Sequence, residues 1–398
     1  MSMEIRAAVL RAPREVRVED VELDEPKAGE VLVRMAAAGV CHSDLHLVNG
    51  ALGDGRWPMV LGHEGAGIVE AVGDDVTNVR PGDRVALCFV PSCRTCPACR
   101  AGRVNLCEPA AANSLRGTLM DGTSRLRLPD GTELQHGLMT ACFAERTVVA
   151  ATGAVPLPDG IPLWQAALLG CAVMTGFGAV RNVARVEPGE SVVVIGAGGV
   201  GLQVLAAAKL AGASPIVVVD RDTSRLERAA QRGADHVVDS STEERLVRTI
   251  RTLTDGGADH AFEVVGLPET MLLAWKALRP GAVAVVVGLA EKGVDVELPA
   301  IEFLLDKGIR GSYYGSGDPA RDIPALAELA SSGVLDLAGV VSHVDDLDGV
   351  PQALERLRRG EGARTVVVLD PDTAGRPDQA TSVSASAPGS WQSRQRAS

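Results

Sequence analysis

The pattern of apolar and polar positions divides the chain into two regions. Up to about residue 172, short runs rich in β-branched residues are broken by Gly and Pro, as at 31–35, 66–72 and 83–87. Such runs at short intervals predict an irregular β-barrel. From 173 onward, apolar strands alternate with helical segments, which predicts a parallel sheet with helices on both faces. The expected fold class is therefore α/β, with a doubly wound parallel sheet and a β-barrel domain.

The second region begins with one complete strand–helix–strand unit. The apolar run 191–195 leads into a glycine-rich turn, a helical segment runs from 202 to 210 and ends at Gly212, and a second apolar run, 216–220, follows. Further strands are expected at 260–265, 283–287 and 309–314, with a capping-box helix start at 241–244. Six parallel strands result, as in a Rossmann-type sheet.

The glycine-rich turn has the spacing of a dinucleotide-binding site. Gly196 permits the tight turn, Gly198 lets the backbone approach a pyrophosphate, and Gly201 lets the helix pack close to the strand. The first helical residues, Gly199 and Val200, supply free N–H groups and partial positive charge for phosphate. The sequence therefore predicts a bound dinucleotide.

The residue that ends the second strand bears on which dinucleotide binds. Asp220 can hydrogen-bond the adenosine ribose hydroxyls and repel a 2'-phosphate, so we expect NAD rather than NADP. Arg225 follows closely, and its guanidinium could soften this discrimination or simply be a solvated helix charge.

Candidate metal ligands occur between residues 41 and 64. Cys41 supplies a thiol and His63 an imidazole, which suit zinc, and a catalytic zinc needs only three protein ligands. Cys171 is the best candidate for the third ligand, because the other cysteines belong to a separate cluster or lack polar surroundings. Alternatively, Cys41 and His63 are buried structural residues.

A second cysteine cluster favours the metal interpretation. Its spacing lets four thiolates turn toward one ion, and four protein ligands leave no open position, so this zinc would be structural. The alternative is a set of unpaired surface cysteines. Two further cysteines, Cys88 and Cys142, are expected to be small buried hydrophobes. The cluster consists of Cys93, Cys96, Cys99 and Cys107.

These motifs together resemble the zinc-dependent alcohol dehydrogenases of the medium-chain dehydrogenase/reductase family. The resemblance covers about residues 4–370, including Gly62-His63-Glu64-x2-Gly67-x5-Gly73, the four-cysteine lobe and an insertion at 116–125. It implies a chaperonin-10-like (GroES-like) catalytic domain at 1–172 and 315–370, and an NAD-binding domain at 173–314. Two Cys and one His are the known catalytic zinc ligands of alcohol dehydrogenases.

The resemblance also implies roles for individual side chains. Ser43 would accept the alcohol proton and pass it, by way of the cofactor ribose, to His46. The carboxylates of Asp44 and Glu64 would orient His63 and tune the metal. The remaining family positions are the pyrophosphate contacts His42 and Arg364, the ribose contact Arg225 and the pocket-lining Phe89. Each of these could instead be an ordinary surface, loop or core residue.

Composition limits the partners. The 398-residue chain has a formal net charge of -12 and 3% aromatic residues, which argues against nucleic-acid or anionic-membrane partners and favours a small soluble substrate. The eight cysteines are closely spaced and no export signal is evident, so we expect a cytoplasmic protein. Residues 371–398 are rich in Ser, Ala and Pro and are expected to be disordered. A homo-oligomer, dimer or tetramer, is expected by resemblance only.

The leading hypothesis is a zinc-dependent oxidoreductase that transfers hydride between a primary or secondary alcohol and NAD, with two zinc ions per chain. One alternative is oxidation of an adduct between formaldehyde and a low-molecular-weight thiol. The residues 109–112 that follow Cys107 lack the basic residue of the glutathione-using members, which weakens that version. Another alternative is a non-catalytic, zinc-stabilised NAD-binding protein. Such a protein, or a zinc-free reductase of the superfamily, would lack part of the ligand set.

Overall fold

The computed structural model describes residues 2–50 and 57–375. Of these, 2–174 and 317–375 form one compact unit, which we call the barrel unit, and Thr175–Ser316 forms the other, which we call the sheet unit. The chain passes from the first to the second within helix α5 (Ala172–Gly178). Each unit is described separately.

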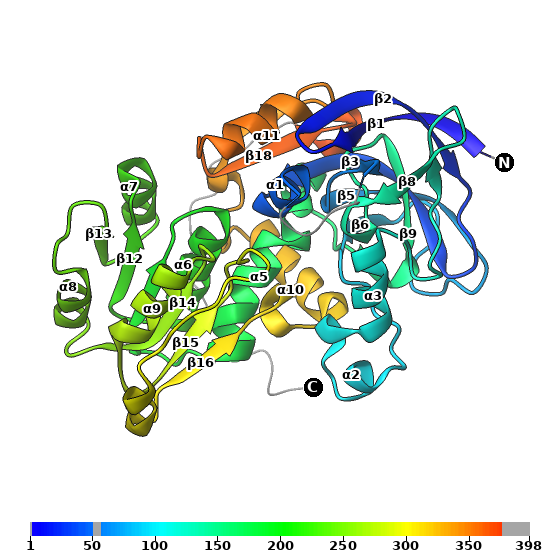
Figure 1. Ribbon diagram of the computed structural model, residues 1–398. Helices are drawn as coiled ribbons and strands as arrows, with labels where there is room; N and C mark the ends of the chain where they lie inside the picture. The colour runs from blue at the N-terminus through cyan, green and yellow to red at the C-terminus, as the bar shows by residue number, and fades with distance from the viewer. Residues whose placement is uncertain (1, 51–56, 376–398) are drawn as a thin grey trace. The chain divides into compact units, whose positions relative to one another are not determined.

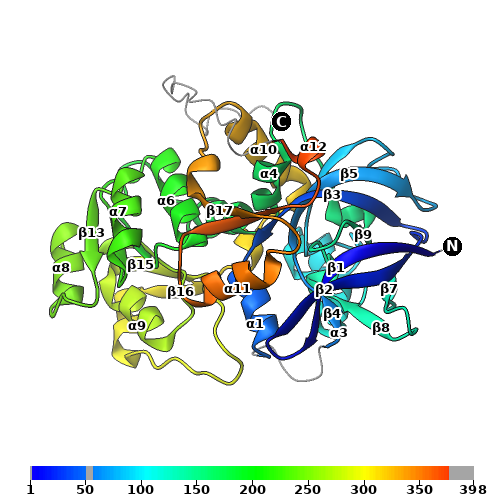
Figure 2. The same ribbon diagram turned by 90° about the horizontal axis from the view of Figure 1, so that it is seen from above.

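The barrel unit contains the closed barrel that the sequence predicts. Its strand order is β1-β2-β7-β8-β4, and Figures 1 and 2 show β1 and β2 in blue and β8 in green. Strands β1 and β2 pair in antiparallel fashion along nearly their whole length. The bounds are β1 Ser2–Ala12, β2 Glu15–Asp24, β4 Met59–Val60, β7 Leu126–Arg127 and β8 Glu133–His136.

A seven-stranded sheet in the same unit carries the residues that lead to the candidate site. Its order is β10-β6-β5-β3-β18-β17, and β9 also pairs with β3. The predicted runs at 31–35, 66–72 and 83–87 fall in β3, β5 and β6, although β6 begins one residue later than expected. The bounds are β3 Glu30–Val40, β5 Glu64–Val72, β6 Arg84–Leu87, β9 Arg146–Ala150, β10 Ala154–Pro156, β17 Val341–Asp345 and β18 Arg364–Val368.

The last described helix corrects the predicted start of the tail. Disorder was expected from residue 371, but Pro371–Ala374 form α12, because the Asp370 carboxylate caps the helix at the Asp372 N–H and pairs with Arg34 of β3. The remainder of that prediction, 376–398, lies outside the described residues. The other helices of this unit are α1 His42–Val48, α2 Pro97–Arg100, α3 Glu108–Arg116, α4 Leu163–Ala166, α10 Pro319–Ser331 and α11 Val350–Arg358.

The sheet unit confirms the predicted six parallel strands. Their order, β13-β12-β11-β14-β15-β16, places the first strand of the unit, β11, beside the fourth, β14. The bounds are β11 Val192–Ile195, α6 Gly199–Ala211, β12 Ile216–Asp220, α7 Thr223–Gln231, β13 His236–Asp239, α8 Leu246–Leu253, β14 Ala258–Glu263, α9 Pro268–Ala277, β15 Leu278–Val286 and β16 Gly308–Gly311.

Helices cover both faces of this sheet (Figure 1). Val193 and Ile195 pack with Ile250 of α8 and Ala274 of α9 in one buried cluster. Alternate residues of a strand point to opposite faces. The intervening Val194 is also fully buried, while α6 contacts β11 and β12. Burial on both faces explains why these strands are continuous apolar runs.

The predicted helix start at 241–244 is wrong. Helix α8 begins at Leu246, after a turn. The Asp239 carboxylate accepts hydrogen bonds from the Ser241 N–H and hydroxyl, at 2.8 Å and 2.6 Å. Ser241 is thereby held in an Asx-type turn instead of capping the helix.

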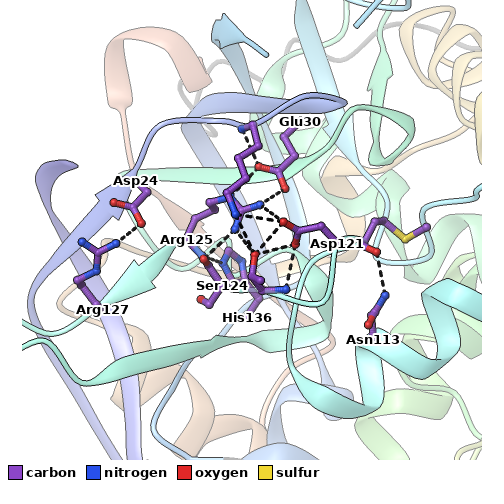
Figure 3. Close-up of polar contacts among 11 residues, drawn as sticks. Asp24, Glu30, Asn113, Asp121, Ser124, Arg125, Arg127 and His136 are labelled. Carbon is purple, nitrogen blue, oxygen red and sulfur yellow. Dashed lines mark hydrogen bonds and ion pairs between the residues drawn. The ribbon is translucent and has the colours of Figure 1, made fainter. Parts of the chain in front are cut away.

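A buried polar network anchors the insertion at 116–125 to the barrel (Figure 3). Arg125, 1% exposed, donates to both carboxylate oxygens of Glu30, at 2.8 Å and 2.6 Å, and to Asp121 at 2.6 Å. Such bidentate pairs are geometrically specific. The Arg125 backbone N–H donates to Nε2 of His136, which is fully buried. Nε2 must therefore be unprotonated, so His136 is neutral.

We predict that this neutral histidine makes the fold acid-sensitive. Burial, with help from the Arg125 charge, lowers the pKa of His136 to about 3. Because this pKa is depressed, His136 contributes full stability above its unfolded pKa near 6.5, and the contribution is lost as the pH falls toward 3, by about 1.4 kcal/mol per pH unit. The measurement is the free energy of unfolding of wild type and His136→Gln between pH 7 and about 4. Identical pH slopes for the two proteins would contradict the assignment.

Candidate active site

Three chain segments of the barrel unit bring the proposed catalytic ligands together. Cys41 follows β3 as the N-cap of α1, His63 directly precedes β5, and Cys171 follows the 3-10 helix η4 (Ala167–Gly170). One ligand atom from each, together with a Glu64 oxygen, lies within 4.8 Å of all the others. All four residues are buried.

Glycines permit this convergence at two points. Gly62 has φ +95°, and a Cβ there would lie 2.5 Å from the Phe143 backbone nitrogen, so the turn before His63 requires glycine. A Cβ on Gly39 of β3 would lie 2.3 Å from Glu64 Oε2. The missing side chain at 39 therefore gives the Glu64 carboxylate its space.

Asp44 holds the His63 ring. His63 Nδ1 lies 3.0 Å from Asp44 Oδ1, and Asp44 Oδ2 accepts the Cys41 backbone N–H at 3.1 Å. Both His63 and Asp44 are fully buried. Bonding Nδ1 to a carboxylate leaves Nε2 as the ligand atom, an arrangement common around metal-binding histidines.

The thiols of Cys41 and Cys171 are hydrogen-bonded to each other, and this bond shifts their pKa values in opposite directions. A hydrogen bond with Cys171 holds the pKa of Cys41 well below its usual value, and the nearby Arg364 charge acts in the same direction. The same hydrogen bond, with burial, raises the pKa of Cys171 well above its usual value. Burial also raises the pKa of Glu64 to about 7. This part of the chain thus collects acidic groups that a cation would stabilise in their ionised forms.

The donor set fits a metal ion. Within the described chain, His63 Nε2 and Glu64 Oε2 are buried without a hydrogen-bond partner, and Glu64 Oε1 has an ion pair with Arg364. Unpartnered buried polar atoms are costly and need an explanation, such as an ion. Two sulfurs and an imidazole nitrogen are donors that zinc prefers. Cys41, His63 and Cys171 are thus the residues that could hold zinc, with Glu64 beside them.

Arg364 also lies at this cluster, a location that no sequence pattern predicted. Its guanidinium Nη1 is 3.1 Å from Glu64 Oε1 and donates to the Val40 carbonyl at 3.1 Å. The residue is 6% exposed. The only sequence signal was an arginine at the start of a buried strand. Its predicted contact with a pyrophosphate stays a prediction.

The other predicted residues of this region lie on α1 or near the His63 ring. Ser43 Oγ is 3.9 Å from Cys41 Sγ and partly exposed. His42 is exposed and His46 partly exposed, with their ring centroids 6.1 Å apart. Phe89, also partly exposed, packs edge-to-face against His63, with centroids 5.2 Å apart and planes at 83°.

The four-cysteine cluster forms a second donor set. The sulfurs of Cys93, Cys96, Cys99 and Cys107 lie within 4.8 Å of one another. Backbone N–H groups already point at them: the Cys96 N–H donates to Cys93 Sγ and the Cys93 N–H to Cys107 Sγ, each at 3.3 Å. Four thiols with oriented amides match a closed structural zinc site.

The glycine-rich turn of the sheet unit has the features that a dinucleotide needs. Gly196 has φ +102°, and a Cβ on Gly201 would lie 1.9 Å from the Gly196 carbonyl oxygen, so the helix packs tightly on the turn. Gly198, the N-cap of α6, has open space within 4 Å of where its Cβ would be. Close approach of a ligand would use this space. Gly199 and Val200 begin the helix.

Asp220 ends β12 and is 8% exposed. Its Oδ2 accepts the Ala197 N–H at 2.7 Å, which ties it to the glycine-rich turn. Arg225 Nη1 lies 3.9 Å from Asp220 Oδ2, and its Nε lies 3.8 Å from an Asp222 oxygen. The guanidinium is therefore beside the carboxylate that was expected to select the cofactor.

Comparisons with known proteins agree with this architecture. Residues 27–159 match the family model of the alcohol dehydrogenase GroES-like domain, and 199–332 match that of the zinc-binding dehydrogenases. A class-3 alcohol dehydrogenase of Cereibacter sphaeroides is 35% identical over 92% of this chain and all of its own length. The S-(hydroxymethyl)glutathione dehydrogenase of Paracoccus denitrificans is 34% identical, with the same coverage.

Solved structures give the same result. A zinc-binding alcohol dehydrogenase domain protein from Burkholderia ambifaria has a TM-score of 0.88 and 34% identity, covering 93% of this chain and 100% of its own. Benzyl alcohol dehydrogenase from Acinetobacter calcoaceticus has a TM-score of 0.87 and 33% identity, covering 92% and 99%.

Among the described helices, none alone is long and apolar enough to cross a membrane, and one bent pair, Leu163–Gly170 with Ala172–Ala184, passes that test only when joined.

The family follows from the structure and the comparisons together. The chain has a GroES-like barrel, a six-stranded parallel sheet and two cysteine-containing donor sets, and it has relatives that are similar over their full length. The chain belongs to the zinc-dependent medium-chain alcohol dehydrogenases.

Proposed function

We propose that this protein transfers hydride between a primary or secondary alcohol and NAD, giving an aldehyde or ketone. The observation that supports the proposal most strongly is the donor set of Cys41, His63 and Cys171, in which His63 Nε2 is buried and unpartnered among the described residues. Three protein ligands leave a fourth position for the substrate oxygen, as in catalytic zinc sites. A second zinc in the four-cysteine lobe would be structural.

A zinc ion in this site would supply the positive charge that lowers the pKa of an alcohol hydroxyl. The protein's own side chains hold the site in shape. Asp44 fixes the His63 ring, and burial of the ligand residues limits access of water. Phe89, packed against His63, is proposed to line the substrate pocket.

Ser43 and His46 are proposed to remove the alcohol proton. The Ser43 hydroxyl lies near Cys41 Sγ. It can accept the proton of the alcohol. His46 is in the last turn of the same helix and partly exposed, so its imidazole can release a proton to solvent. Histidine suits this step because it exchanges protons near neutral pH.

The cofactor is proposed to bind at the glycine-rich turn and at Asp220. Support comes from the open space at Gly198 and from the buried carboxylate that ends β12. His42, Arg225 and Arg364 are further proposed contacts. For Arg364, a pyrophosphate contact would have to coexist with its Glu64 pair.

A thiol adduct of formaldehyde is the second candidate substrate. It is favoured by relatives named S-(hydroxymethyl)glutathione dehydrogenase, including that of Paracoccus denitrificans. Against the glutathione version, α3 continues from Cys107 with Pro109 and three alanines instead of a basic residue. An NAD-reduction screen of alcohols, with and without formaldehyde plus glutathione or other thiols, distinguishes the two substrate classes.

We also propose a cytoplasmic homo-oligomer, a dimer or a tetramer. The cytoplasm is supported by cysteines grouped as metal donors. Oligomerisation is supported by large apolar side chains that are exposed on the sheet unit, in the segments before and after the edge strand β16. These side chains, with their exposed fractions, are Ile301 72%, Phe303 47%, Leu304 79%, Leu305 45% and Tyr313 50%. Exposed apolar patches of this kind commonly mark interfaces.

We expect Cys41→Ser and His63→Ala to abolish turnover and to lower the zinc content from two ions per chain to one, because each removes a ligand of the open site. NAD affinity should change little. The measurements are alcohol-dependent NAD reduction, metal analysis and cofactor titration. Cys142→Ala, which removes a buried thiol outside both donor sets, is the control. Normal turnover in either ligand variant would refute the site.

Asp220→Gly should relax the preference for NAD over NADP, because it removes the carboxylate that repels a 2'-phosphate. The Arg225 guanidinium, which lies 3.9 Å from Asp220 Oδ2, would then attract that phosphate. The measurement is the ratio of kcat/KM for the two cofactors. Glu227→Gln, which replaces an exposed carboxylate of α7, is the control. An unchanged ratio in Asp220→Gly would count against the ribose role.

The double variant Ile301→Asp/Leu304→Asp should dissociate the oligomer, because two buried carboxylates would be unpaired at the interface. Light scattering coupled to size-exclusion chromatography gives the particle mass. Leu115→Asp, which alters a similarly exposed leucine of α3 on the barrel unit, should leave the mass unchanged. A wild-type monomer would contradict the proposal, and an unchanged oligomer in the double variant would exclude this surface.

A further inference from the structure

Glu263 is a buried carboxylate at the point where the order of the parallel strands reverses. It is the last residue of β14, is 0% exposed, and lies in register with Ile195 of β11 and Val286 of β15. Strands β11 and β14 are neighbours although two strands separate them in the chain. Ligands of open α/β sheets bind at such reversal points, beyond the carboxyl ends of the strands.

One oxygen of Glu263 organises the whole turn that follows the strand. Oε1 accepts the Val265 N–H at 2.8 Å, the Gly266 N–H at 2.7 Å and the Thr270 hydroxyl at 2.8 Å. Thr270 belongs to the first turn of α9, so the carboxylate links the end of the strand to the start of the helix. Three donors on one carboxylate oxygen offset much of the cost of burying this polar side chain.

The turn held by Glu263 packs on the glycine-rich turn. A Cβ on Gly196 would lie 2.8 Å from Val265 Cγ2 and 3.1 Å from Val264 Cγ2. A Cβ on Gly201 would lie 3.2 Å from the same Val264 methyl. The two valines therefore occupy the space beside the glycines, and the conformation of residues 264–266 decides how the glycine-rich turn is supported.

The same residue also fixes the next segment along the sheet edge. Its backbone carbonyl accepts the N–H groups of Val287 and Gly288, at 2.8 Å and 3.0 Å. Gly266, with φ +93°, packs against that segment so closely that a Cβ would lie 2.4 Å from the Leu289 carbonyl oxygen. A shift of the 264–266 turn would therefore disturb both the glycine-rich turn and the segment 287–289.

We propose that Glu263 is a positioning residue for the dinucleotide: through its hydrogen bonds to the 264–266 turn, it holds Val264 and Val265 against the glycine-rich turn and so sets NAD affinity. This inference rests on the proposed NAD site and assigns to it a residue that makes no direct cofactor contact. The side chain acts through Oε1, while Oε2 has no hydrogen-bond partner among the described residues.

A graded set of variants tests the proposal. Glu263→Leu removes the acceptor of all three donors, and we expect it to raise the Kd for NADH by about tenfold or more. Thr270→Val removes one donor and should have a smaller effect. Glu263→Gln keeps an acceptor oxygen for the three donors and should fall between wild type and Glu263→Leu. Glu269→Gln, which neutralises an exposed carboxylate of the same helix, is the matched control.

The readouts are NADH binding by calorimetry, zinc content, and kinetics on the zinc-loaded protein. We expect KM for NAD to rise with Kd, while zinc content and kcat at saturating NAD stay near wild type. Should Glu263→Leu fail to fold, Glu263→Gln and Thr270→Val decide the question by the same measurement. Wild-type Kd in the folded variants would overturn the inference, and so would a loss confined to kcat. Absence of NADH binding by the wild type would instead overturn the proposed function.

Discussion

The structure depends on one constraint. Four buried side chains, two thiols, an imidazole and a carboxylate, have ligand atoms that lie within 4.8 Å of one another. Two thiolates and a carboxylate cannot lie together in an apolar interior without compensating positive charge, and an imidazole that binds a metal must be neutral. Arg364 supplies one positive charge, paired with Glu64. His63 Nε2 still lacks a partner in the described chain. A metal ion satisfies both the charge and the nitrogen, and the chemistry of the protein follows from that ion.

The fold meets this constraint by placing each ligand where an element begins or ends. Cys41 follows β3, His63 precedes β5, and Cys171 follows η4, so rigid structure fixes each backbone while the side chains converge. Antiparallel pairing of Gly39 with Glu64 brings two of these ends into register. In the sheet unit the same principle holds for Asp220 and Glu263, which end the two strands on either side of β11. Ends of elements combine precision with access to a ligand.

Short-range patterns could be predicted from the sequence, whereas contacts between distant residues could not. The glycine-rich turn and the four-cysteine spacing are local, and the predicted α/β fold with a barrel and six parallel strands is confirmed. The helix start at Ser241 failed because Asp239 competes for its N–H. The Arg125–Glu30 pair and the Glu64–Arg364 pair join residues far apart in the chain, which no spacing reveals. Glu263 lies inside the strand expected at 260–265, so the sequence pattern did not place it at a strand end.

The most direct test of this account is a crystal structure of the zinc-loaded protein with anomalous diffraction at the zinc edge. The account predicts two ions per chain, one of them about 2.3 Å from the sulfurs of Cys41 and Cys171 and about 2 Å from His63 Nε2. A non-protein oxygen should complete that site, while the second ion lies among the four lobe sulfurs. Zinc found only in the lobe, or a first site closed by a fourth protein ligand in every state, would contradict it.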